Sequence, residues 1–126
     1  MKVAVVEVVA VLMMSAPAFA ERQIVDNNAT VSVDCKKDSE VTLVGNNLTV
    51  TLVGTCTRVN VTGNREKVTG SATAFFIGGN HNTVTADSTD DITLAGNHNT
   101  ITWKKSGKGT PKIANPGKDN KVSQVR

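Results

Sequence analysis

Aromatic residues are scarce in this sequence, and tyrosine is absent. The chain of 126 residues contains one tryptophan and three phenylalanines. Proteins that bind sugars or single-stranded nucleic acids use aromatic rings as platforms on which the ligand stacks. The composition therefore leaves little material for such platforms.

Charge of either sign is limited as well. Fourteen basic and eleven acidic residues give a formal net charge of +3. The basic residues gather in the segment 103–112, WKKSGKGTPK, and not in a stripe with interleaved aromatic rings, so the sequence does not indicate nucleic-acid binding. The length fits a single domain.

The side-chain combinations on which most enzymes depend are also missing. No serine or cysteine has a plausible base partner. The only acidic cluster comprises Asp87, Asp90 and Asp91, in a turn-like segment where solvated acids are common. We therefore predict no catalytic residue and no cofactor.

The first twenty residues have the features of a signal peptide. Lys2 supplies a basic start, residues 8–14 form an apolar run, and Ala18-Phe19-Ala20 fits a cleavage site. The apolar run is too short to remain as a membrane span. We expect cleavage after Ala20, export to the periplasm or beyond the cell, and one domain over residues 21–126. The alternative is a buried N-terminal strand or helix.

The two cysteines, Cys35 and Cys56, are expected to form a disulfide. An even number of cysteines in an exported protein usually indicates pairing. The alternative is a pair of free, buried thiols.

A short polar phrase recurs along the chain at intervals of 19, 18, 16, 17 and 21 residues. Its copies are DNNATV, GNNLTV, GNREKV, GNHNTV, GNHNTI and GKDNKV, which begin at residues 26, 45, 63, 79, 96 and 117. Apolar runs centred on residues 41, 59, 75, 92 and 113 lie between the copies, at intervals of 18, 16, 17 and 21. Because the two series change together, we infer one winding coil that carries two short strands per turn.

Both series alternate apolar and polar residues with the period of a β-strand. An antiparallel sandwich would also accommodate short strands at this spacing, but it has no reason to repeat the same residues at the same corner. The sequence therefore predicts an all-β fold, a small parallel β-solenoid of about five to six short coils.

The recurring glycine and asparagines should form the corner of each coil. Glycine suits a bend that requires a positive φ. In a parallel stack, equivalent asparagines lie about 4.8 Å apart and can link successive coils through their amides. The expected asparagine ladder consists of Asn46, Asn64, Asn80, Asn82, Asn97 and Asn99.

Two further features of the repeat suggest a ligand. His81 and His98 should stack on the surface one coil apart, but two imidazoles are too few for a structural zinc site, and we predict no metal ligands.

Threonines alternate outward on one sheet, as on ice-binding solenoids. That column is interrupted by Lys67 and ended by Lys121, and threonine is also common on any wet strand face.

The recurring G-[ND]-x-N-x-[VI]-T phrase, the early cysteine pair and the closing NPGKDNKVSQ resemble an uncharacterised family of bacterial exported proteins, known only as a domain of unknown function. The resemblance covers Asp26 to Gln124. It implies export and repeated strands, and it brings no activity, ligand or catalytic residue. Glu66 and Lys67 depart from the asparagine and threonine usual at their places.

These observations favour an exported, non-catalytic structural or binding protein of the bacterial cell envelope. An envelope polysaccharide and a second copy of the chain, added at an open end of the stack, are the partners that this interpretation allows. Nucleic acid and a membrane span are not expected. The alternatives are a small carbohydrate-acting β-helix enzyme and, with less support, an ice-binding solenoid.

Overall fold

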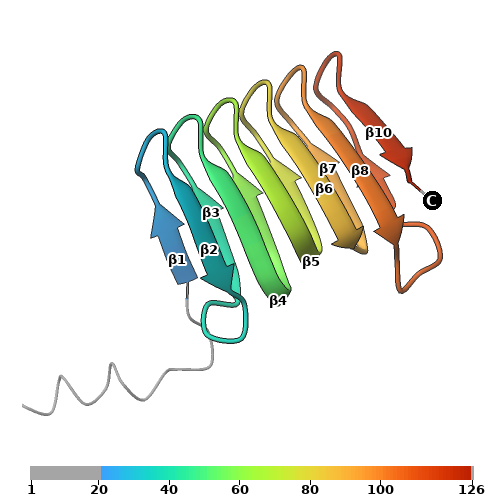
Figure 1. The fold of residues 1–126 in the computed structure, drawn as a ribbon. Helices are drawn as coiled ribbons and strands as arrows, with labels where there is room; N and C mark the ends of the chain where they lie inside the picture. The colour runs from blue at the N-terminus through green and yellow to red at the C-terminus, as the bar shows by residue number, and fades with distance from the viewer. Residues whose placement is uncertain (1–20, 126) are drawn as a thin grey trace, which may run out of the picture.

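The computed structural model describes residues 21–125 as a stack of β-strands wound into a coil (Figure 1). The expected signal peptide, residues 1–20, lies outside the described residues. The strands are β1 (Glu21–Ile24), β2 (Thr30–Asp34), β3 (Glu40–Leu43), β4 (Thr49–Val61), β5 (Lys67–Ile77), β6 (Thr83–Ser88), β7 (Asp91–Leu94), β8 (Thr100–Lys105), β9 (Lys112–Ala114) and β10 (Lys121–Gln124).

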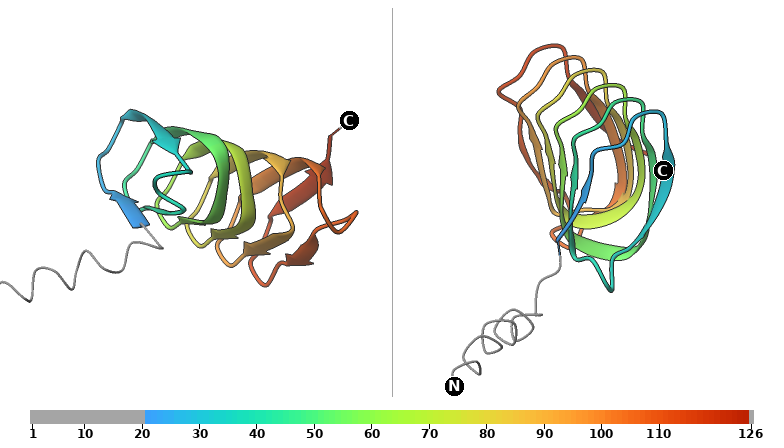
Figure 2. Two further views of the ribbon diagram at one scale, coloured as in Figure 1. Left: turned by 90° about the horizontal axis from the view of Figure 1, so that it is seen from below. Right: turned by 90° about the vertical axis from the view of Figure 1, so that its left-hand side faces the viewer.

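The coil is a flattened tube with two sheet faces, and the end-on view in Figure 2 shows its narrow cross-section. We call one the β8 face, which contains β2, β6, β8, β10 and the first parts of β4 and β5. The other is the β7 face, which contains β1, β3, β7, β9 and the last parts of β4 and β5. The long strands β4 and β5 bend from one face to the other.

Every strand pairing among the described residues is parallel and joins equivalent positions of successive turns. On the β8 face, for example, Val50 pairs with Val68, which pairs with Val84, which pairs with Ile101. An antiparallel sandwich would pair neighbouring strands in opposite directions. The prediction of a parallel solenoid is therefore confirmed, with about six turns.

The core lies between the two faces and consists of the inward residues of each strand. The strands of both faces alternate buried and exposed positions, because successive side chains of a strand point to opposite sides. Leu94 is fully buried, whereas the preceding Thr93 is half-exposed on the surface of β7. Phe75 and Trp103 are the largest side chains that the core takes up.

Replacing Leu94 with alanine should lower the free energy of unfolding by about 2–5 kcal/mol, because it removes buried methyl groups and leaves a cavity. Replacing Thr93 with alanine should change it by less than about 0.5 kcal/mol. Urea titration of the two variants measures both values. Equal losses would show that the assignment of inward and outward faces on β7 is wrong.

The predicted disulfide is present between Cys35 and Cys56, with 4.7 Å between their Cα atoms. Cys35 follows β2, and Cys56 lies in β4 beyond a register shift at Gly54, whose φ is +85°. Both cysteines are buried. The bond ties the first turn to the second, and closing a loop of 21 residues should stabilise the fold by roughly 3 kcal/mol.

Candidate functional site

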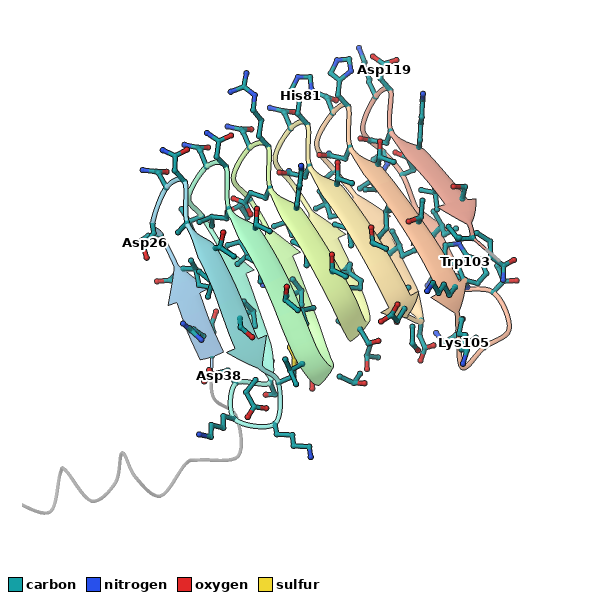
Figure 3. All side chains as sticks on the ribbon, in the orientation of Figure 1. Asp26, Asp38, His81, Trp103, Lys105 and Asp119 are labelled. Atoms are coloured by element: carbon teal, nitrogen blue, oxygen red, sulfur yellow. A yellow bond between two sulfur atoms is a disulfide. The ribbon has the colours of Figure 1, made fainter. Side chains whose placement is uncertain are left out.

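The repeated phrase forms one edge of the tube, which we call the corner ridge. Figure 3 shows His81 and Asp119 on this edge, with Asp38 and Lys105 at the opposite one. The third residue of each phrase has a left-handed backbone, with φ between 56° and 59°. These residues are Asn28, Asn47, Arg65, His81, His98 and Asp119. The expectation that the corner glycines supply the positive φ is therefore wrong.

The corner glycines are needed for a different reason, which is the close approach of successive turns. A Cβ atom on Gly63 would overlap the carbonyl oxygen of Gly45, and a Cβ on Gly79 would overlap that of Gly63. The same holds for Gly96 and Gly117 with respect to the preceding turn. The first turn, which has no described turn before it, carries Asp26 at this place.

An outer column of asparagines links each turn to the next one through its backbone. The side-chain oxygen of Asn64 accepts the backbone N–H of Asn80 at 3.0 Å, and that of Asn80 accepts the N–H of Asn97 at 3.0 Å. Asn27, Asn46 and Asn97 accept in the same way at 2.8–3.2 Å. Asparagine therefore serves this corner mainly as a backbone acceptor. The expected bond between amides occurs in this column between Asn64 and Asn46, at 3.3 Å.

The side chains of an inner column of asparagines form hydrogen bonds with backbone N–H and carbonyl groups of preceding turns. Asn99 accepts the N–H of Asn82 at 2.9 Å and donates to the carbonyl oxygen of Gly79 at 2.9 Å. Asn82 and Asn120 make the equivalent pairs of bonds. Because a tight corner takes these backbone groups out of the sheet ladder, a buried side chain must satisfy them. The predicted asparagines thus make ladder-like contacts in two columns with opposite directions, and the side chains of Asn82 and Asn99 bind backbone groups.

Glu66 interrupts the inner column in the third turn. Its side chain is buried, and neither carboxyl oxygen has a hydrogen-bond partner among the described residues. Burial raises the pKa of this carboxyl to about 7 from an ordinary value of 4.5. When protonated, the carboxyl is a donor and an acceptor, as an amide is. Glu66 therefore stands at the place of asparagine in this turn without the backbone hydrogen bonds that Asn82 and Asn99 make.

The raised pKa makes the stability of the fold depend on pH. The folded state holds the Glu66 proton more tightly than the unfolded state, so this contribution is complete below pH 4.5 and is lost as pH rises through about 7. Replacing Glu66 with glutamine should remove this loss. The loss should reach about 3 kcal/mol at pH 8 in the wild type. Urea titration of both proteins at pH 5 and pH 8 tests this, and a parallel pH dependence in the variant would contradict it.

The two histidines stack as the sequence suggests. Their ring centroids are 5.0 Å apart and the rings are nearly parallel, at 3°. The Nε2 atom of His98 lies 3.7 Å from a carboxylate oxygen of Asp119. Lone pairs on parallel rings do not converge on one point, as metal ligation requires. No group of three or more His, Cys, Asp or Glu side chains within residues 21–125 is arranged to hold a metal ion.

The acids of the acidic cluster bind groups of the following turn. Asp90 accepts hydrogen bonds from the Ser106 hydroxyl at 3.1 Å and from the Gly107 N–H at 2.7 Å. Asp87 pairs with Lys104 at 3.8 Å, and Asp91 pairs with Lys108 at 3.4 Å. The basic segment that bulges after β8 is therefore fixed by these acids. Each of the three carboxylates contacts a different partner, so these contacts do not bring them to a common point.

The outward residues of the β8 face form two columns. The first is interrupted by lysines and runs through Thr30, Thr49, Lys67, Thr83, Thr100 and Lys121. The second carries a hydroxyl on every turn and runs through Ser32, Thr51, Thr69, Thr85, Thr102 and Ser123. Sequence reasoning found the first column with its two breaks and missed the continuity of the second.

The β7 face carries an exposed aromatic side chain, Phe76. Phe76 points outward and is 39% exposed in a column whose other members are Gln23, Thr42, Asn60, Thr93 and Ala114. Sequence reasoning did not assign it a site. Strand alternation could have identified it, because a residue that directly follows the inward Phe75 must point outward.

The architecture defines a short, disulfide-tied parallel β-solenoid. Residues 64–119 match the model of a family described as "Protein of unknown function (DUF3060)", so this part of the chain is similar to that domain of unknown function. No curated protein and no solved structure matches the chain. Within the described residues, no helix has the length and apolar character to cross a membrane.

Proposed function

We propose that the chain is an exported, non-catalytic structural or binding protein of the bacterial cell envelope. The observation that carries this proposal is the regularity of the surface. The β8 face presents columns of mostly short polar side chains, and the β7 face presents a mostly charged column beside a mixed one, all at the spacing of adjacent strands, about 4.8 Å. A stiff, repetitive surface suits a polymer with its own repeat.

Export is supported by the disulfide and by the N-terminal sequence. Disulfides persist in oxidising compartments and are rare in the cytosol. Residues 1–20 have the basic start, the apolar run and the cleavage site of a signal peptide. The proposed location is therefore the periplasm or the cell exterior, with residues 1–20 removed.

The alternative of a carbohydrate-acting enzyme has less support. Such an enzyme requires two acids that converge across a groove. Asp87, Asp90 and Asp91 instead bind groups of the following turn. Glu66 is buried in the core and faces no groove.

Self-association by adding one stack to the end of another also has less support. In an in-register stack of two copies, the Asp26 of one copy would occupy the place that glycine occupies in later turns. Its Cβ would then meet the carbonyl oxygen of Gly117, as a Cβ at each later corner would meet the preceding turn. We therefore propose that the partner is another molecule.

The test is expression of the full chain in a bacterial host, followed by fractionation and mass measurement. The proposal predicts a disulfide-bonded protein that begins at Glu21 and co-sediments with insoluble envelope polysaccharide. An exported protein of similar size and charge serves as the control. Recovery in the cytosol with residues 1–20 intact, or release from the envelope fraction equal to the control, would overturn the proposal.

A further inference from the structure

We propose that the β7 face holds a binding site for an anionic saccharide, centred on Phe76. The inference rests on the proposed function, because it specifies which ligand class the binding protein takes and where. We call this site the Phe76 groove and define it by Arg58, Asn60, Ala74, Phe76, Asp91, Thr93 and Lys112.

The first argument is the exposure of an aromatic ring that the core does not use. Small residues lie two positions before and after Phe76, namely Ala74 within β5 and Gly78 just beyond its end. A Cβ on Gly78 would lie 3.2 Å from an edge carbon of the ring, so the ring leans over the glycine. The ring is therefore accessible between short neighbours. Aromatic rings with this exposure bury large apolar areas when a ligand covers them.

The second argument is the shape of the surface beside the ring. Ala74 is the single uncharged member of its column. The column runs through Glu21, Glu40, Arg58, Ala74, Asp91 and Lys112. The missing side chain leaves two adjoining depressions of about 250 and 370 Å³, which share Ala74, Asp91 and Thr93. Together they form a shallow groove across the last four turns, which suits an extended chain better than a compact molecule.

The third argument is the distribution of charge. Arg58 and Lys112 flank the groove three strands apart, about 14 Å. Neither forms a salt bridge within residues 21–125, whereas Asp91 between them is paired with Lys108 at 3.4 Å. The groove therefore offers two free cations and one neutralised acid. A ligand with carboxylates at intervals along a chain complements this pattern.

The polar neighbours of the ring fit hydroxyl groups. Asn60 donates to the Thr42 hydroxyl at 3.3 Å, which leaves its amide oxygen as an acceptor. Thr93 presents a hydroxyl on the opposite side of Phe76. A sugar ring has an apolar face for the aromatic side chain and hydroxyls at its rim for these groups. A uronic acid adds the carboxylate that Arg58 or Lys112 would bind.

The experiment is calorimetric titration of the disulfide-bonded chain, residues 21–126, with a homo-oligosaccharide of galacturonic acid and with its neutral galactose counterpart. The site predicts binding of the uronate that weakens as salt is added, and weaker or no binding of the neutral sugar. Phe76→Ala and Arg58→Gln should each weaken uronate binding by about tenfold or more. Lys67→Gln removes one exposed cation from the β8 face and should leave the affinity unchanged.

The outcomes separate this site from the proposed function. Uronate binding that survives both Phe76→Ala and Arg58→Gln, with unchanged melting temperatures, overturns the Phe76 groove. Absence of uronate binding by a chain that still co-sediments with the envelope fraction overturns this ligand class alone. Loss of envelope retention overturns the proposed function as well.

Discussion

Replacing Gly79 with alanine should abolish or nearly abolish the stable fold. The added Cβ would overlap the carbonyl oxygen of Gly63 and approach the Thr62 carbonyl oxygen at 2.9 Å. Both obstacles are backbone atoms of the preceding turn, held by the sheet on either side, so no side-chain rotation relieves the overlap. We expect a loss of more than about 4 kcal/mol, a large part of the stability of a small domain.

The neighbouring Gly78 provides a matched control. An alanine there would meet an edge carbon of the Phe76 ring at 3.2 Å, and an exposed ring can move aside. The free energy of unfolding should therefore change by less than about 1 kcal/mol. Urea titration of both variants is the measurement. Similar losses at the two positions would mean that turns approach less closely at the corner than the structure indicates.

Replacing Asn99 with alanine should have the second largest effect. The change leaves the buried N–H of Asn82 and the carbonyl oxygen of Gly79 without partners. Each stranded group destabilises a fold by about 1–3 kcal/mol, so the two together should lower the free energy of unfolding by about 2–6 kcal/mol. Thermal melting or urea titration of the disulfide-bonded chain gives the value.

His98→Asn is the control within the same phrase. Asn28 and Asn47 hold the same left-handed backbone at this place in the first two turns, so the change introduces no backbone strain. We expect little change in melting temperature, with or without added zinc. If His98→Asn is the damaging change, and zinc raises the melting temperature of the wild type alone, the phrase is a metal site and the structural account of it fails.

The fold could be predicted because the corner and the strands repeat with linked spacing. A shorter turn shifts both series by the same amount, as between residues 63 and 79, and only a continuous coil produces that relation. The inward parity of Asn82 and Asn99 could likewise be predicted from strand alternation. The pairing of Cys35 with Cys56 followed from the even number of cysteines in a chain with the features of export.

Other features depend on distances that a sequence does not contain. Glycine at a corner suits both a positive φ and a close approach, and coordinates were needed to show that the close approach decides. The role of Asp90 depends on how the segment after β8 folds back, which composition does not specify. A site at Phe76 could be recognised only from the strand register of four turns. That register places the short side chain of Ala74 in a column of charged residues beside Phe76.

The proposed function treats the chain as a binder that leaves its ligand intact. The direct test is prolonged incubation of the disulfide-bonded chain with insoluble envelope polysaccharide, with bound protein and newly formed chain ends measured over time. The account predicts stable retention of the protein and no increase in chain ends above a protein-free sample. A steady increase in chain ends that scales with protein concentration would show that the solenoid is an enzyme and would contradict the account.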